Sequence, residues 1–136
     1  MARRIARAAW TGRERFIPRL TGLDDAVAIA RDASRGDRAP VILADCADNP
    51  GGGGRGNTTW ILRALHEAKV GTGVVLGVFV DPALAAACHA HGVGATFRAA
   101  FASDESEFSH RFDADVVVEG LSDGQSIGRR GIAEGR

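Results

Sequence analysis

This sequence has few cysteines and no excess of charge of either sign, and each of these features excludes a class of protein. Its 136 residues carry 17 basic and 17 acidic side chains, so no broad basic surface is expected for binding nucleic acid. Two cysteines, Cys46 and Cys88, cannot build a disulfide framework, and the basic amino terminus does not have the form of a secretory leader. These features predict a cytoplasmic protein that does not bind nucleic acid.

Long apolar runs are also missing. The longest, Val74–Val80, is far shorter than the roughly 20 residues that a membrane-spanning helix needs, so no membrane partner is expected. A hydrophobic share of 45% and a charged share of 25% are ordinary for a folded domain. Glycine is abundant instead, with 18 residues and no three-residue period, which predicts glycine-rich turns rather than a collagen helix.

Hydrophobic periodicity predicts an α/β protein. Apolar residues recur at helical spacing in four stretches, which begin at Ala2, Leu23, Thr58 and Pro82. Two runs rich in β-branched residues, Pro40–Asp45 and Val74–Val80, are typical of strands that are buried on both faces of a parallel sheet. Asp81 is expected to cap the helix that begins at Pro82, where proline is favoured. The helix that begins at Thr58 is expected to end near Gly71.

The carboxy-terminal part predicts further strands. Gly94–Phe101 alternates loosely and is expected to be a third strand, and Ala114–Leu121 is expected to pair with Ser126–Gly128 across Ser122–Gln125, because Asp-Gly favours a hairpin. The predicted fold class is α/β, with a short mainly parallel sheet flanked by helices and a C-terminal antiparallel hairpin, in one domain over residues 1–136. The sequence stops before another element is completed, so we expect a truncated or split piece.

The segment Cys46–Asn57 joins the first predicted strand to a helix through four consecutive glycines. Glycines let backbone N–H groups approach a ligand, and a helix amino terminus attracts anions. We therefore expect this loop to bind a carboxylate, a polarised carbonyl or a phosphate, with Asn57 or Thr58 as the helix cap. A second role for Asp48 stays open, in which it holds its own turn through backbone N–H groups. The candidate substrate-binding residues are Asp48, Asn49, Gly51, Gly52, Gly53, Gly54, Gly56, Thr58 and Thr59.

Two nucleotide-binding patterns match the loop only in part. Gly51, Gly53 and Gly56 satisfy G-x-G-x-x-G, but six residues separate Ala44 from Gly51, whereas the dinucleotide fold turns directly at the strand end. The phosphate loop of nucleotide hydrolases requires a lysine where this sequence has Asn57. Both patterns are weak, and a plain glycine turn without a ligand is a further interpretation.

Histidines and cysteines are too scattered to predict a metal site. Cys88, His89 and His91 adjoin at a predicted helix end, but residues one or two apart on a helix point in different directions. His66 is expected on a helix surface, and nothing fixes the geometry of His110. No metal ligand is assigned to this chain. A serine hydrolase is disfavoured, because no serine follows a strand at a sharp strand-to-helix turn.

The loop and its surroundings resemble the C-terminal domain of the microcystinase C (MlrC) family of zinc metallopeptidases. Similarity extends from about Phe16 to Arg130, and Arg55 and Asn57 depart from the proline and the aspartate that are common in the family. The matching runs are Ala47-Asp48-Asn49-Pro50-Gly51-Gly52-Gly53, Gly56-x-Thr58-Thr59, Leu62-Arg63-Ala64-Leu65, Asp81-Pro82, Gly92-Val93-Gly94-Ala95 and Leu121-Ser122-Asp123-Gly124.

The resemblance implies one portion of a two-part peptide or amide hydrolase. In that family an N-terminal domain binds zinc through aspartate and histidine, and the domain seen here packs beside it. We therefore expect zinc outside this chain, a glycine-rich loop that faces a small peptide-like substrate, and no activity of the chain alone; catalytic residues are not assigned. The expected partner is that N-terminal domain or its equivalent on another chain, with self-association as another way to cover apolar surface. The alternative function is a non-catalytic module that binds an anion or phosphate on the same loop.

Overall fold

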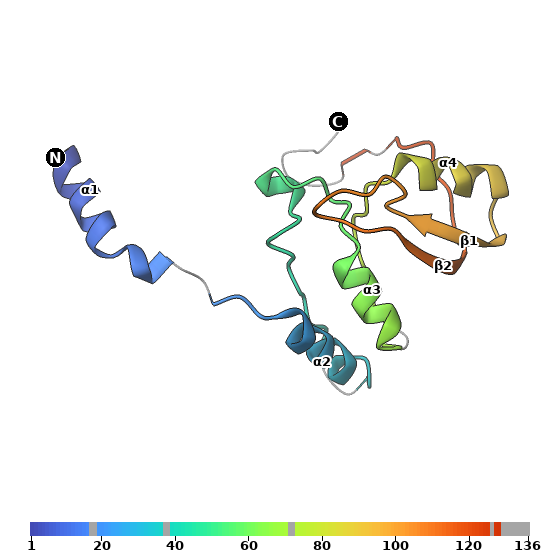
Figure 1. The fold of residues 1–136 in the computed structure, drawn as a ribbon, viewed down its shortest axis with the longest axis horizontal. Coiled ribbons are helices and arrows are strands. Elements are labelled where there is room, and N and C mark those ends of the chain that lie inside the picture. Colours follow the sequence, from blue (N-terminus) through green and yellow to red (C-terminus); the bar gives the residue numbers. More distant parts are fainter. Residues whose placement is uncertain (17–18, 37–38, 71–72, 126, 129–136) are drawn as a thin grey trace.

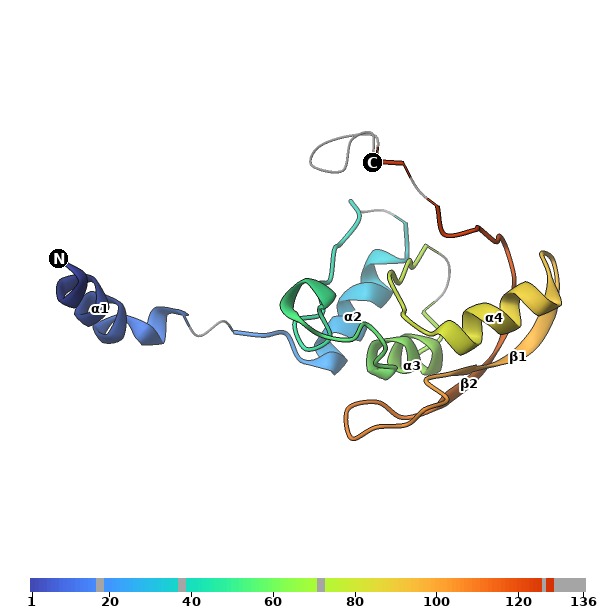
Figure 2. The same cartoon turned by 90° about the horizontal axis from the view of Figure 1, so that it is seen from above.

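The computed structural model describes residues 1–16, 19–36, 39–70, 73–125 and 127–128, and within these ranges it contains four α-helices and a two-stranded sheet. Helix α1 (Ala2–Thr11) and the 3₁₀ turn η1 (Arg13–Phe16) stand apart from the rest in both views (Figures 1 and 2). The body consists of helices α2 (Leu23–Ala33), α3 (Trp60–Glu67) and α4 (Pro82–His91), the 3₁₀ turn η2 (Pro50–Gly52), and strands β1 (Thr96–Phe101) and β2 (Phe112–Val117).

All four predicted helices are present. Helix α4 begins as expected, because the Asp81 carboxylate accepts a hydrogen bond from the Leu84 N–H at 2.9 Å and Pro82 occupies the first helical turn. Helix α3 begins later than predicted, with Thr59 rather than Asn57 or Thr58 at its cap position. The Thr59 hydroxyl makes no capping bond, because it donates to the His110 carbonyl instead. Gly71, the predicted end of this helix, lies outside the described residues.

The prediction of a mainly parallel sheet is wrong. The sheet consists of β1 and β2, which pair antiparallel from Thr96 opposite Val117 to Phe101 opposite Phe112. An antiparallel hairpin is therefore present, but β2 pairs with the strand that precedes it in the sequence. The predicted partner of Ala114–Leu121 was Ser126–Gly128, of which Ser126 lies outside the described residues. The third predicted strand is confirmed as β1.

The two expected parallel strands, Pro40–Asp45 and Val74–Val80, have no strand assignment. Both segments line a cavity of about 680 Å³, so the space between them is not closed by direct pairing. Ile42 is 91% exposed and Val75 is 94% exposed, which shows that neither segment is covered on both faces. A β-branched apolar run indicates that a segment favours burial, but it does not identify the neighbours that would bury it.

The best-packed part of the body lies where α4 and the hairpin meet. Helix α4 contacts β1, and Figure 2 shows it running beside the two strands. Phe101 links two aromatic neighbours, with ring centroids 5.6 Å from Phe79 and 6.1 Å from Phe112. Helices α2 and α3 pack on each other, and Arg31 donates to the Ala68 carbonyl at 3.1 Å. The buried apolar side chains among the described residues are Ala99, Ala102, Phe112, Ala114 and Val118.

Among the described helices, none has the length and apolar character needed to span a membrane.

Candidate substrate-binding loop

Asp48 organises the glycine-rich loop. Its Oδ1 accepts a hydrogen bond from the Gly56 N–H and its Oδ2 accepts one from the Thr58 N–H, each at 2.7 Å. Partial burial acts to raise the pKa of this carboxyl, but the N–H groups of Thr58, Gly56 and Asn57 and the Thr58 hydroxyl together lower it below the ordinary value of 3.8. Asp48 is therefore ionised near neutral pH and fixes the second half of the loop to the first.

A compact turn forms the first half of the loop. The Asn49 side chain accepts from the Gly51 N–H at 2.9 Å, and the Asn49 carbonyl accepts from the N–H groups of Gly52 and Gly54 at 2.9 and 2.8 Å. Gly53 adopts a left-handed conformation with φ of 94°. A Cβ added at Gly54 would lie 2.7 Å from the Asn49 nitrogen, so the close approach of the backbone requires glycine there.

Gly56 joins the loop to the apolar segment Val74–Val80. Its carbonyl accepts from the Val80 N–H at 2.7 Å, and its φ is 71°. A Cβ at this position would meet Pro50 Cγ at 3.0 Å and Val80 Cγ2 at 3.2 Å. This glycine is buried and is required both for its backbone conformation and for the space that it leaves to its neighbours.

The end of the loop and the start of α3 are held by the segment 108–111. The buried Thr59 hydroxyl donates to the His110 carbonyl at 2.6 Å, and the buried Ser109 hydroxyl donates to the Asn57 carbonyl at 3.1 Å. Trp60 and Arg63 add side-chain bonds to the carbonyls of Phe108 and Arg111. We call these four bonds the α3 clamp. Sequence patterns did not reveal it, because its acceptors are backbone carbonyls about 50 residues away in the sequence.

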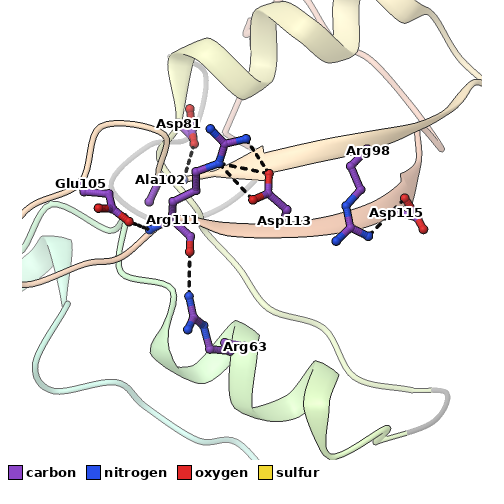
Figure 3. Close-up of polar contacts among 8 residues, drawn as sticks. All are labelled: Arg63, Asp81, Arg98, Ala102, Glu105, Arg111, Asp113 and Asp115. Carbon is purple, nitrogen blue, oxygen red and sulfur yellow. Dashed lines mark hydrogen bonds and ion pairs between the residues drawn. The ribbon is translucent and has the colours of Figure 1, made fainter.

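Polar contacts also fix the connection between β1 and β2 that carries segment 108–111 (Figure 3). Asp81 accepts from the Ala102 N–H at 3.0 Å, and Glu105 accepts from the Arg111 N–H at 2.9 Å. The Arg111 guanidinium binds Asp113 through Nη2 and Nε at 2.8 to 3.2 Å. The hydrogen bond from Arg111 lowers the pKa of Asp113, and Asp113 raises the pKa of Arg111. A second pair, Arg98 with Asp115, bridges the two strands at 3.4 Å.

All five glycine N–H groups of the loop have partners inside it. Those of Gly51, Gly52, Gly53, Gly54 and Gly56 bind acceptors of Asp48, Asn49 or Pro50, and the Thr58 N–H binds Asp48. The predicted site residues are therefore brought together, but chiefly as a self-bonded framework. Whether they contact a substrate stays a prediction. Thr59 is 1% exposed, so its side chain stabilises the framework rather than facing solvent.

The polar groups that the loop presents outward are different ones. Arg55 is exposed and Asn57 is half-buried, and no hydrogen bond of either side chain is found within the described parts of the chain. Both line a cavity of about 960 Å³, together with Arg19 and the aromatic residues Trp60 and Phe108. A guanidinium and an amide beside apolar rings suit a peptide-like ligand that carries a carboxylate or carbonyl. The sequence patterns had assigned neither residue to the site.

The described residues do not form a zinc site by themselves. No three histidine, cysteine, aspartate or glutamate side chains among them come together in a way that could hold a metal ion. His91 stacks on Phe97 with ring centroids 4.2 Å apart, and the rings of His66 and His110 lie edge-on to Phe112 and Trp60. These histidines therefore make packing contacts. Cys46 and Cys88 are free thiols.

The fold and the loop define an α/β chain whose glycine-rich turn, fixed by an internal carboxylate, leads into a helix. A comparison with protein families matches residues 43–136 to the family described as MlrC C-terminus. The match covers more than half of the chain, including the whole glycine-rich loop, the α3 clamp and the hairpin. This chain belongs to the MlrC C-terminus family. Searches of curated proteins and of solved structures found no significant match.

Proposed function

We propose that this chain is the substrate-binding portion of an MlrC-like peptide or amide hydrolase whose zinc is bound by a separate domain or polypeptide. Membership of the MlrC C-terminus family supports the class. The observation that carries the proposal is the loop fixed by Asp48, which holds Arg55 and Asn57 in the lining of a cavity that Trp60 and Phe108 also line. A loop that is already ordered loses less conformational entropy on binding, so less of the binding free energy is offset.

Arg55 is the residue proposed to bind the ligand directly. Its guanidinium can donate two parallel hydrogen bonds to a carboxylate, a geometry that lysine does not offer. Trp60 and Phe108 line the same cavity and would contact the apolar part of a peptide-like substrate. Asp48 acts through the loop as a positioning residue, because both of its oxygens bind backbone N–H groups. The proposed role of this chain is thus to bind and orient the substrate.

Zinc chemistry is assigned to no residue of this chain. The described residues offer no three ligands at one place, so they do not fit a zinc ion on their own. The proposed hydrolase therefore needs ligands from elsewhere, and the chain alone with added zinc should not hydrolyse peptides. Turnover of a peptide by the purified chain and zinc, abolished by a chelator, would contradict this division of roles.

The anion-binding alternative is less well supported. In a phosphate-binding loop, backbone N–H groups point to the bound anion. Here the Asp48 carboxylate accepts the N–H groups of Gly56 and Thr58, so a negative charge already occupies that position. A phosphate placed near it would be repelled rather than attracted. Peptide carboxylate binding at Arg55 does not require these N–H groups, but Asp45, Asp48 and Glu107 line the same cavity, so the Arg55 guanidinium must offset their charge.

Calorimetry with a short peptide tests the proposal. N-acetyl-dialanine with a free carboxylate should bind about tenfold more tightly than its C-terminal amide, since a charge-assisted bidentate contact is worth roughly that factor. Arg55→Gln should remove the preference, whereas Arg7→Gln on the separate helix α1 should leave it unchanged. Equal binding of the two peptides, or tighter binding of inorganic phosphate than of the peptide carboxylate, would refute the proposed site.

A further inference from the structure

Helix α1 extends away from the body of the protein. Every residue of Ala2–Thr11 is exposed, and the helix packs on the adjacent 3₁₀ turn η1. Both views show it pointing away from the other helices and the hairpin (Figures 1 and 2). It also precedes residues 43–136, which match the family, so membership of the family does not explain it.

Positive charge is concentrated in this part of the chain. Residues 1–16 contain five arginines and one acidic residue, and because the whole chain is neutral, residues 17–136 carry a net charge of −4. Within the part of the chain that the structure describes, Arg3, Arg4 and Arg7 form no hydrogen bond or ion pair through their side chains. A large anionic surface would therefore attract α1 but not the body of the protein.

The arginines and the apolar side chains of α1 lie on different faces. Successive residues of an α-helix are about 100° apart, so Arg3, Arg4 and Arg7 fall within one arc of about 100°. Ile5 lies on the opposite side among alanines and is 62% exposed. Trp10 lies at the boundary between the two faces and is 71% exposed. A cationic face, an apolar face and a tryptophan at their boundary are typical of helices that lie at a membrane surface.

We infer that α1 binds the surface of an anionic lipid bilayer, with its axis parallel to the membrane plane. The arginines would contact anionic headgroups, while Ile5 and the Trp10 ring enter the boundary between headgroups and acyl chains. The lack of a long apolar run excludes a spanning helix, but surface binding needs only one apolar face. The bilayer therefore neutralises the cationic face of α1 and covers its apolar face at the same time.

The helix itself gains stability from such a surface. It has ten residues and no side-chain hydrogen bond at its N-cap, and Arg3 and Arg4 lie in its first turn, where the helix dipole disfavours positive charge. A helix of this length without tertiary packing is only marginally stable in water. Anionic headgroups reduce the repulsion, so the helix content of the chain should rise on binding.

Other occupants fit α1 less well. A groove on a protein binds large apolar side chains along one line of a helix, but Ile5 and Trp10 point in directions about 140° apart. Nucleic acid would neutralise the arginines and leave Ile5 uncovered. A second copy of α1 would bring like charges together. A fluid bilayer needs no matching shape and accepts both faces.

Flotation of the full chain with lipid vesicles tests this inference. The chain should bind vesicles of equal parts phosphatidylserine and phosphatidylcholine, should not bind vesicles of phosphatidylcholine alone, and should bind less as salt is added. Replacing Arg3, Arg4 and Arg7 together by glutamine should weaken binding about a hundredfold, because each arginine near the surface contributes roughly a factor of five.

The charge-matched control replaces Arg35, Lys69 and Arg98 by glutamine. These residues are exposed on the body, so the control removes the same number of charges away from α1 and should weaken binding less than about threefold. Equal weakening by the two triple variants would overturn the inference. Equal binding of the wild type to both kinds of vesicle, binding to neither, or tighter binding to duplex DNA would overturn it as well.

Ile5→Asn separates insertion of the apolar face from attraction by charge alone. It should weaken binding roughly tenfold, because a large aliphatic side chain no longer leaves water. Val93→Asn is its control, since Val93 is 65% exposed on the body. Vesicles should also shift the fluorescence of the wild type to the blue, and Trp10→Phe should remove that shift. Equal binding of Ile5→Asn and the wild type, or an unchanged helix content in circular dichroism, would overturn the inferred docking of α1.

Discussion

Replacing Asp48 with asparagine should lower the free energy of unfolding by about 2 kcal/mol. A hydrogen bond to a charged group contributes about 1.5–3 kcal/mol, and partial exposure of Asp48 reduces this to roughly 1 kcal/mol for each of its two bonds. Asparagine keeps one acceptor oxygen but turns an NH₂ group toward the second N–H donor. The lost hydrogen bond costs roughly 1 kcal/mol and the repulsive contact between two donors costs about as much again, which gives the expected loss of about 2 kcal/mol.

Urea denaturation measures this change directly. In a domain of this size, about 2 kcal/mol corresponds to a fall in melting temperature of about 6–8 °C. Asp123→Asn is the matched control, because Asp123 also accepts a backbone N–H, that of Gln125 at 3.0 Å, but in an exposed turn. Its effect should stay within about 0.5 kcal/mol.

The pH dependence gives a second check on the same residue. The pKa of Asp48 is lowered in the folded state, so its contribution is complete above the ordinary value of 3.8 and is lost as the pH falls through the folded pKa. The stability difference between wild type and Asp48→Asn should therefore shrink in acid below that value. A difference that equals the Asp123 control, or that does not change with acidification, would refute the role assigned to Asp48.

Three further outcomes are expected. Thr59→Val should cost about 1–2 kcal/mol in urea denaturation, because it leaves the buried end of the α3 clamp without its hydrogen bond to the His110 carbonyl; an unchanged midpoint would contradict the clamp. Gly54→Ala should destabilise more than Gly53→Ala, since only the Gly54 Cβ would collide with backbone atoms, and the reverse order of melting temperatures would count against the turn geometry. Equilibrium dialysis of the chain against zinc should find no tightly held ion, and about one tightly bound zinc per chain would mean that a site has been missed.

The helices were predictable because their signals are local. Helical spacing of apolar residues located α1 to α4, and Asp81 with Pro82 marked the start of α4. Asp81 also accepts a hydrogen bond from the Ala102 N–H after β1. This second role was not predictable, because the two residues are 21 positions apart in the sequence and meet only through the packing of α4 on the sheet. The family could also be identified from the sequence, since its motifs around the loop are specific.

The sheet could not be predicted correctly, because pairing is a property of two segments. Val74–Val80 has the composition of a buried parallel strand, yet its valines are largely exposed and no strand pairs with it in the described residues. For the candidate site, glycine content predicted a loop whose backbone N–H groups would meet a ligand, and in the structure these groups have partners within the loop. The position of Asp48 makes the difference, since a carboxylate within the loop binds the N–H groups that a ligand would otherwise meet.

Amide chemical shifts of the ¹⁵N-labelled chain during titration with N-acetyl-dialanine test the central claim most directly. The account predicts that the largest shifts occur at Arg55, Asn57 and the Trp60 indole, which line one cavity beside the loop fixed by Asp48. It also predicts that these shifts disappear in Arg55→Gln. Saturable shifts that map instead to α1 or the β1–β2 hairpin, or no shifts at any accessible peptide concentration, would contradict substrate binding by this loop.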